Sequence, residues 1–215
     1  MFFGKNICKA EDRILMTTDL KFETICKDVL GAHENETTVL AIFYFEATVE
    51  RFRKILDEKN IRYQILESCR DVSDCDFSEL EKLNILSFDA FIGLKANKQI
   101  QEKINSLSGG VRVFLLEHYP LPVKDKEVLE LVKVSVFSNC KVIFYVSLED
   151  PLMRIFGSDK IKVLLEKLGC SDGLIEHPMF RTAISQAQGK IKEMATGDEK
   201  TASSEAWFRY FCPVL

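Results

Sequence analysis

Glu117 and His118 are neighbouring side chains with the chemistry of an acid–base pair. They directly follow the apolar run Val111–Leu116, which is typical of a buried strand, and α/β proteins place their active sites at the carboxyl ends of strands. A carboxylate and an imidazole at that place could transfer protons. The stiff YPLP sequence at 119–122 supports a second interpretation, in which the segment only shapes a crossover loop. We favour this second interpretation and predict no catalytic residue.

Seven cysteines are scattered along the chain, at positions 8, 26, 69, 75, 140, 170 and 212. No C-x-x-C pair is present, and Cys69 with Cys75 lacks the second pair or the histidines of a zinc site. We therefore expect reduced thiols, no metal and no other cofactor. The sequence leaves open a cysteine–histidine dyad whose two residues are far apart in the sequence and close together in the fold. Of the remaining histidines, His177 is expected to cap or pack a helix and His33 to lie solvated in a polar loop.

The last four residues, Cys212-Pro213-Val214-Leu215, fit the C-a-a-X pattern of a prenylation site. Proline is not a typical residue at the first middle position, and the preceding FRYF is not polybasic. A single prenyl chain anchors a protein only weakly. Lipidation at Cys212 is thus one interpretation, and an apolar tail that packs or simply ends the chain is the other.

Composition and charge indicate a globular protein without affinity for nucleic acid. The 215 residues are 47% hydrophobic and 29% charged, with a net charge of -4. The basic residues Arg51, Arg53, Lys54 and Lys59 share a predicted helix with acidic residues, as on a solvated face. No apolar run approaches the roughly 18 residues of a membrane span, and the N-terminal sequence does not resemble a secretory signal. We expect a cytoplasmic protein that contacts membranes only if Cys212 is prenylated.

Apolar runs alternate with amphipathic segments through the first two thirds of the chain. The predicted strands are Thr38–Phe45, Ile61–Leu66, Phe88–Leu94, Val111–Leu116 and Lys141–Val146. The predicted helices are Thr18–Leu30, Glu46–Lys59, Asp76–Leu83, Ala96–Leu107 and Lys124–Lys133. This alternation predicts a doubly wound α/β domain with a mainly parallel sheet.

The pattern becomes helical after Val146. Ser147 and Asp150 could cap a helix that runs through Phe156, and further helices are expected at 158–168 and 176–194. We predict an α/β domain over residues 12–146, a helical extension over 147–194 and a mobile polar tail over 195–215.

The run Tyr145–Asp159 (YVSLEDPLMRIFGSD) closely resembles a segment of SecA, the motor ATPase of bacterial protein translocation. Similar stretches cover residues 12–194, in the order of the second nucleotide-binding domain of that family and the start of its helical scaffold. These stretches are Arg13–Val29, Val39–Glu46, Ile61–Leu66, Leu164–Gly169, Ile175–Pro178 and Ala183–Gln188. The resemblance implies a RecA-like fold of the helicase second-domain type.

In the SecA family, ATP lies between two RecA-like domains, and the resemblance also shows what this chain lacks. It contains no G-x-x-x-x-G-K-[ST] loop. The family's GRGTD-type turn is replaced by Gly93–Lys98 (GLKANK). The family's arginine-rich stretch, which acts on the γ-phosphate, is replaced by Glu127–Val136 (EVLELVKVSV). Because one arginine finger contributes about 10³- to 10⁵-fold in rate, the resemblance implies a domain without a motor site.

We therefore expect a SecA-derived, catalytically inactive RecA-like domain that acts as an interaction or adaptor module for a protein partner. Two alternatives stay open. The chain could be the second-domain half of a split SecA-type ATPase in protein translocation, or a membrane-attached adaptor prenylated at Cys212.

Overall fold

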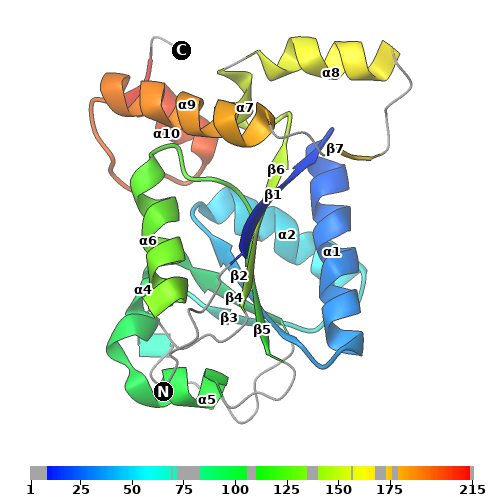
Figure 1. The fold of residues 1–215 in the computed structure, drawn as a ribbon, viewed down its shortest axis with the longest axis vertical. Coiled ribbons are helices and arrows are strands. Elements are labelled where there is room, and N and C mark those ends of the chain that lie inside the picture. The colour runs from blue at the N-terminus through cyan, green and yellow to red at the C-terminus, as the bar shows by residue number, and fades with distance from the viewer. Residues whose placement is uncertain are drawn as a thin grey trace, which may run out of the picture.

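A mainly parallel β-sheet forms the centre of the molecule (Figure 1). The computed structural model describes residues 9–68, 70–71, 83–105, 110–134, 140–155, 157–167, 173–175 and 179–213. The strands within these residues are β1 (Lys9–Leu15), β2 (Thr38–Phe43), β3 (Gln64–Leu66), β4 (Leu83–Ser87), β5 (Val111–Leu115), β6 (Lys141–Ser147) and β7 (Leu174–Ile175). They form one seven-stranded sheet in the order β3-β4-β2-β5-β6-β1-β7. Only the β1–β7 pair of this described sheet is antiparallel.

Helices cover both faces of the sheet. Their bounds are α1 (Thr18–Glu34), α2 (Glu46–Glu58), α4 (Phe88–Gly93), the 3₁₀ turn η2 (Leu94–Ala96), α5 (Lys98–Asn105), α6 (Pro122–Val134), α7 (Pro151–Arg154), α8 (Ser158–Lys167), α9 (Met179–Met194) and α10 (Ser204–Phe211). On one face, α1 and α2 pack through side chains such as Phe22 and Phe52, whose stacked rings lie 5.7 Å apart. On the other face, α4, α5, α6, α7, α9 and α10 contribute to a second core. The prediction of a doubly wound, mainly parallel α/β fold is confirmed.

The buried strands follow from their sequence. All six residues of β2 are buried, as expected for a continuous apolar strand with helices on both sides. The predicted elements at 46–59, 96–107, 111–116, 124–133 and 141–146 agree with α2, α5, β5, α6 and β6 within a few residues. The predicted helix at 76–83, apart from Leu83 at the start of β4, and the region of His177 lie outside the described residues.

The strand predicted at Phe88–Leu94 is wrong. The preceding residues Leu83–Ser87 form β4, and the chain then turns into α4 and η2. Ser87 is the cause, because its hydroxyl accepts a hydrogen bond from the Ala90 N–H at 3.1 Å and caps the helix. Asp89 in the first turn adds a favourable interaction with the helix dipole.

Helix α1 is longer than predicted, and it includes His33 in its last turn. The prediction that His33 lies solvated in a polar loop is wrong, because this residue belongs to the helix and its side chain is half-buried. The reason is Ala32, which is fully buried and extends the apolar face of the helix by one turn. Strand β1 is not predicted, because its charged residues Glu11, Asp12 and Arg13 interrupt the apolar pattern by which strands are recognised. In the structure it pairs in register with β6.

The C-terminal segment packs against the second core instead of forming the mobile tail that we expected. Helix α10 begins at its cap Ser203, whose hydroxyl accepts a hydrogen bond from the Ala206 N–H at 3.1 Å. Trp207 is fully buried, and its indole N–H donates to Asp198 at 3.0 Å. Asp198 also accepts a hydrogen bond from the Tyr119 hydroxyl, which joins this segment to the loop after β5. The buried indole explains why this polar sequence is held in place.

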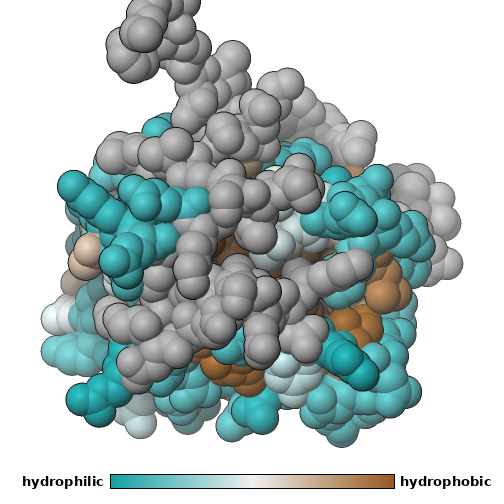
Figure 2. Space-filling model, turned by 90° about the horizontal axis from the view of Figure 1, so that it is seen from below, coloured by the Kyte–Doolittle hydropathy of each residue, from teal (hydrophilic) through white to brown (hydrophobic). Residues whose placement is uncertain are grey.

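The two edges of the sheet differ in character. The amino ends of the strands lie at the lower edge in Figure 1, and Figure 2 views the molecule from that side. There the described surface is mostly hydrophilic, with smaller hydrophobic areas between. The carboxyl ends lie at the opposite edge, where α1, α2 and α10 begin. None of the described helices is long and apolar enough to cross a membrane.

Candidate functional site

A cavity of about 150 Å³ lies at the carboxyl edge of the sheet. The amino-terminal parts of α1, α2, α7 and α10 and the loops after β5 and β6 supply most of its walls. We call it the carboxyl-edge cavity; its lining residues are Thr18, Lys21, Phe22, Ala47, Thr48, Arg51, Glu117, His118, Val146, Glu149, Asp150, Pro151, Leu152, Ser203, Ser204 and Glu205. This is the edge at which α/β proteins bind their ligands.

Glu117 is the buried carboxylate of the carboxyl-edge cavity. Its Oε2 accepts a hydrogen bond from the Thr48 hydroxyl at 2.9 Å. Its Oε1 is buried and has no hydrogen-bond partner among the described residues. Burial raises the pKa of Glu117 to about 7, although the nearby charge of Lys21 and the hydrogen bonds from Thr48 and the Tyr44 backbone oppose the shift. The carboxyl group is therefore ready to gain or lose a proton near neutral pH.

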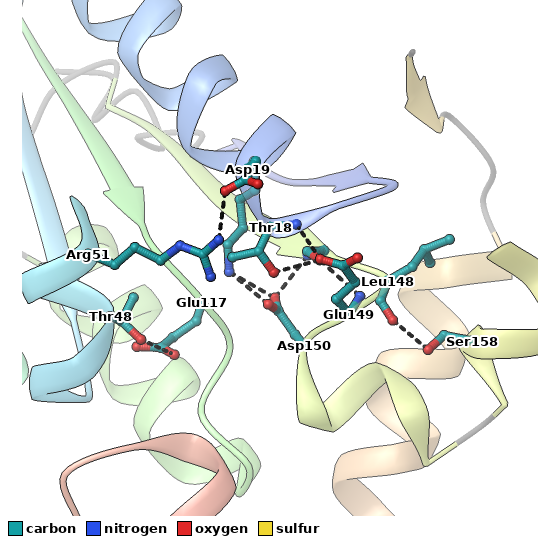
Figure 3. A network of polar contacts seen from close by, with 11 residues as sticks. Thr18, Asp19, Thr48, Arg51, Glu117, Leu148, Glu149, Asp150 and Ser158 are labelled. Atoms are coloured by element: carbon teal, nitrogen blue, oxygen red, sulfur yellow. Dashed lines mark hydrogen bonds and ion pairs between the residues drawn. The ribbon is translucent and has the colours of Figure 1, made fainter. Parts of the chain in front are cut away.

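Lys21 and Asp150 form a buried ion pair beside Glu117 (Figure 3). The Lys21 Nζ lies 2.9 and 3.0 Å from the two carboxylate oxygens of Asp150. Asp150 Oδ2 also accepts the Ser147 N–H at 2.9 Å, which closes the turn after β6. The pair thus connects the first turn of α1 to the turn that precedes α7. Asp150 also neutralises the charge of Lys21, the one lysine among the described residues that line the cavity.

Glu149 makes a second link between the same segments. One of its oxygens accepts the Thr18 N–H at 2.8 Å, at the amino end of α1. The other accepts from Lys162 of α8. The hydroxyl of Ser147 accepts the Glu149 N–H at 2.9 Å and fixes this conformation. These contacts explain why the LED sequence at 148–150 stands at the end of β6.

Arg51 lies at the mouth of the cavity, where its guanidinium donates to Asp19 at 2.6 Å. Both side chains are largely exposed, at 48% and 79%. Arg53 and Lys54 of α2 and Lys59 just after it are also exposed, as predicted for a solvated face that mixes basic and acidic residues.

His118 points into a different set of contacts. Its Nδ1 lies 2.7 Å from Asp125 Oδ2, its Nε2 lies 3.4 Å from Asp12 Oδ1, and its ring stacks on Phe144 with centroids 4.3 Å apart. Burial alone would lower the pKa of the imidazole, but the charges and hydrogen bonds of Asp125 and Asp12 raise it to about 9. His118 is thus a buried cation at neutral pH, and its hydrogen bonds do not lead to Glu117.

Asp125 is the centre of that second network. Its Oδ1 accepts from the Tyr44 hydroxyl at 2.8 Å and from the Tyr119 N–H at 3.2 Å. Its Oδ2 accepts from the Gln188 amide at 2.7 Å as well as from His118. We call these residues the Asp125 network. Every lone-pair direction of the carboxylate has a donor, which is the pattern of a structural group.

The two segments that the resemblance aligns with the family's nucleotide-contacting sequences, 93–98 and 127–136, lie side by side over the residues that the structure describes. Gly93 ends α4 and Leu94–Ala96 form η2, so the first segment is helical and not a glycine-rich turn. The second segment lies largely in α6. Between them is a cavity of about 270 Å³, the α4–α6 cavity, lined by Ile92, Lys95, Glu127, Glu130 and Leu131.

Cys212 is 4% exposed and packs in the second core. A prenyl chain could reach its thiol only if the end of the chain left this core. Lipidation of Cys212 stays a prediction. Among the described residues, no group of three or more His, Cys, Asp or Glu side chains is arranged to hold a metal ion.

The sequence indicated Glu117 and His118 but missed Lys21, Thr48 and Glu149. Lys21 carried a usable signal, because it falls on the apolar face of α1 beside Phe22 and is only 2% exposed. Glu149 and Asp150 gave a second signal in the sequence, since two carboxylates come shortly after a buried strand. Thr48 carried none.

The parallel sheet, the helices on both faces and the cavity at the carboxyl edge define an α/β domain of the RecA-like type. The chain matches the sequence model of the SecA P-loop domain over residues 138–173. It is 29% identical to the protein translocase subunit SecA of Pelagibacter ubique over 84% of this chain and 23% of the relative. For the SecA subunit of Aliarcobacter butzleri the identity is 30% over 85% of this chain and 21% of the relative. These matches show that the chain is related to the SecA family.

The similarity is uneven along the chain. The SecA subunit of Methylococcus capsulatus is 56% identical to it, but over 50 residues, or 23% of this chain and 6% of the relative. The C-terminal part of the Fun30 ATPase domain, a solved structure, has a TM-score of 0.44 and 14% identity over 79% of this chain and 54% of that one. The chain spans less than a quarter of the length of the SecA subunits that it matches.

Proposed function

We propose that this SecA-related chain is a RecA-like module of protein translocation that binds protein and does not hydrolyse ATP. The α4–α6 cavity is the main support for the absence of hydrolysis. It lies between the segments that correspond to the family's GRGTD-type turn and its arginine-rich stretch, and Ile92, Leu131, Glu127 and Glu130 face it. Apolar and acidic groups stand where the phosphates of ATP need fixed positive charge.

The charges around the α4–α6 cavity disfavour the binding of a triphosphate. Among the described residues that line the cavity, Lys95 is the one cation and Glu127 and Glu130 are two anions. A triphosphate would therefore meet net repulsion. A lysine also cannot make the two parallel hydrogen bonds by which an arginine holds a phosphate. The missing arginines alone remove about 10³-fold or more of rate each.

Exposed apolar residues on α8 support the protein-binding part of the proposal. Val163 and Leu164 are adjacent, and their exposed fractions are 49% and 57%. In Figure 1, α8 stands apart from the sheet, and while its Ile161 and Leu165 pack against the second core, Val163 and Leu164 are left exposed. Apolar side chains that a fold leaves exposed together are typical of contact surfaces.

Calorimetric titration of the chain with ATP and with ADP, each with magnesium, tests the first part. We expect no binding heat at nucleotide concentrations up to about 1 mM, which corresponds to a binding free energy weaker than about -4 kcal/mol. A micromolar dissociation constant would contradict the proposal. Stimulated ATP hydrolysis after addition of a SecA nucleotide-binding domain from another chain would instead support a split motor.

Fluorescence anisotropy with a labelled, permanently unfolded polypeptide tests the second part. Leu164→Asp should weaken binding by about tenfold, because a charge replaces an apolar contact. Val123→Asp is the matched control, since Val123 is exposed to 47% on α6, away from α8. Equal losses in both variants would contradict a role for α8.

A further inference from the structure

We propose that the carboxyl-edge cavity binds the cationic end of a basic side chain, such as an arginine guanidinium, that a partner polypeptide presents. The inference deepens the proposed protein-binding function and rests on it. It starts from Glu117 Oε1, a buried carboxylate oxygen of the cavity that has no hydrogen-bond partner; the other such atom among the lining residues is His118 Nε2, which lies 3.4 Å from Asp12 Oδ1. A buried carboxylate oxygen without a partner is unfavourable, so a donor placed there gains a charge-assisted hydrogen bond.

The cations that line the cavity are already engaged. Lys21 binds both oxygens of Asp150, and Arg51 binds Asp19. His118 is directed to Asp125 and Asp12. None of these groups donates a hydrogen bond to Glu117, whose hydrogen-bonding side-chain partner is the neutral hydroxyl of Thr48. The cavity therefore has an acceptor to offer to a cation from outside.

The helix ends around the cavity do not turn it into an anion site. Four of the described helices, α1, α2, α7 and α10, begin there, and an N–H group in the first turn of each has a partner: Thr18 donates to Glu149, Ala47 to the Ala202 carbonyl at 2.9 Å, Met153 to the Asp150 carbonyl at 2.8 Å, and Ala206 to Ser203. Free N–H groups at a helix start are what hold a phosphate or sulfate. With these groups satisfied, an anion would find few donors.

Charge and size point to the same ligand. The lining residues include four carboxylates, Glu117, Glu149, Asp150 and Glu205, against Lys21, Arg51 and the inward-turned His118. Glu205 is exposed at the start of α10, where it could contact an incoming cation first. A volume of about 150 Å³ admits the end of a side chain and not a nucleotide.

The test uses N-acetyl-arginine amide as the probe and the ¹⁵N–¹H NMR spectrum of the whole chain at pH 8 as the readout. We expect shifts at Thr48, Glu117 and the neighbouring loops that saturate at millimolar probe. The neutral analogue N-acetyl-citrulline amide has the same shape without the charge, and it should bind at least about tenfold more weakly. Equal shifts with both probes, or no saturable shift, would overturn the proposal.

Two variants locate the effect. Glu117→Gln keeps the shape and the acceptor for Thr48 but removes the charge, and should weaken arginine binding about tenfold. Glu130→Gln in the α4–α6 cavity is the matched control and should leave binding unchanged. If Glu117→Gln failed to fold, Glu205→Gln at the surface would serve, with an expected loss of about two- to threefold. Unchanged affinity in the variant that folds would overturn the proposal.

The outcome can be separated from that of the proposed function. The arginine probe could fail to shift the NMR signals while the chain still binds no nucleotide and still binds the polypeptide through α8. That result would reject the proposed arginine site and leave the proposed function standing. Micromolar ATP binding would reject the proposed function, whatever the arginine probe does.

Discussion

Glu117 and His118 leave the end of β5 next to each other, and they reach two opposite kinds of environment. His118 joins the Asp125 network, in which both oxygens of the central carboxylate have two donors each. Glu117 enters the carboxyl-edge cavity, where one of its oxygens has a donor and the other has none. The comparison shows how to separate structure from function in a buried polar cluster. Asp125, whose two oxygens are fully paired, stabilises the fold, and Glu117, which is only partly paired, is left for a ligand.

Removing the centre of the paired cluster should have the largest effect. Asp125→Ala leaves four donors without an acceptor, one of them a buried cation, and should cost about 4 kcal/mol of unfolding free energy. Urea-induced unfolding measures it. The control Asp19→Ala removes a carboxylate that is 79% exposed and should cost less than about 1 kcal/mol. Similar losses in the two variants would remove the distinction between paired core and surface.

The C-terminal segment joins the paired cluster through Tyr119 and Asp198, so Trp207 should matter nearly as much. Trp207→Ala is expected to destabilise the chain by about 3 to 4 kcal/mol, because it leaves a cavity in the second core. Tyr210→Ala on the same helix, where the side chain is 66% exposed, should change stability by less than about 0.5 kcal/mol. If both variants unfolded at the same urea concentration, the tail would be mobile after all.

The unpaired carboxyl group should be visible in the pH dependence of stability. Because burial raises the pKa of Glu117 from 4.5 to about 7, the unfolded state releases this proton first, and the group destabilises the fold as pH rises through this window. Glu117→Gln should match the wild type near pH 4.5. At pH 8 the variant should be more stable by about 2 to 3 kcal/mol.

The neighbour provides the contrast. His118 has a pKa raised to about 9, so its contribution is complete below about 6.5 and is lost as pH rises toward 9. That loss should persist in Glu117→Gln. Urea unfolding of both proteins from pH 4.5 to 9 separates the two groups, and parallel curves would show that Glu117 is not unpaired in solution.

The smallest effect is expected at the mouth of the cavity. Arg51→Gln breaks an ion pair with Asp19 that water and salt can reach, and should cost less than about 1 kcal/mol. The loss should shrink further in 1 M salt, where charges are screened over about 3 Å. A larger loss of unfolding free energy, or one that does not depend on salt, would show that Arg51 contributes to stability as a buried, paired residue does.

Hydrophobic patterning was sufficient to predict the central strands of the sheet, because β2, β5 and β6 are apolar runs whose burial follows from helices on both faces. It failed where one side chain decides between conformations. The apolar run from Leu83 to Leu94 could be strand or helix, and the hydroxyl of Ser87 makes the second half a helix. It also failed at Trp207, since the polar run before this aromatic residue predicted a mobile tail although the indole is buried in the core.

The candidate site was predictable only in part. The position of Glu117 after a strand indicated the carboxyl edge, but its separation from His118 depends on Thr48, Asp12 and Asp125, which come from three other segments. Such long-range pairings have no signature in a single sequence. The resemblance alone suggested a domain without motor sequences, while the α4–α6 cavity between the two segments follows only from the fold.

The place of β1 in the sheet has a consequence for biosynthesis. Lys9 of β1 pairs with Lys141 of β6, which lies 132 positions later, and the other neighbour of β1 is β7, which lies later still. At roughly 5 to 20 residues per second, a ribosome needs on the order of ten seconds to deliver that partner. During this time β1 must wait with its backbone groups unpaired, and its charged residues Glu11, Asp12 and Arg13 keep the waiting strand soluble and discourage pairing with other chains.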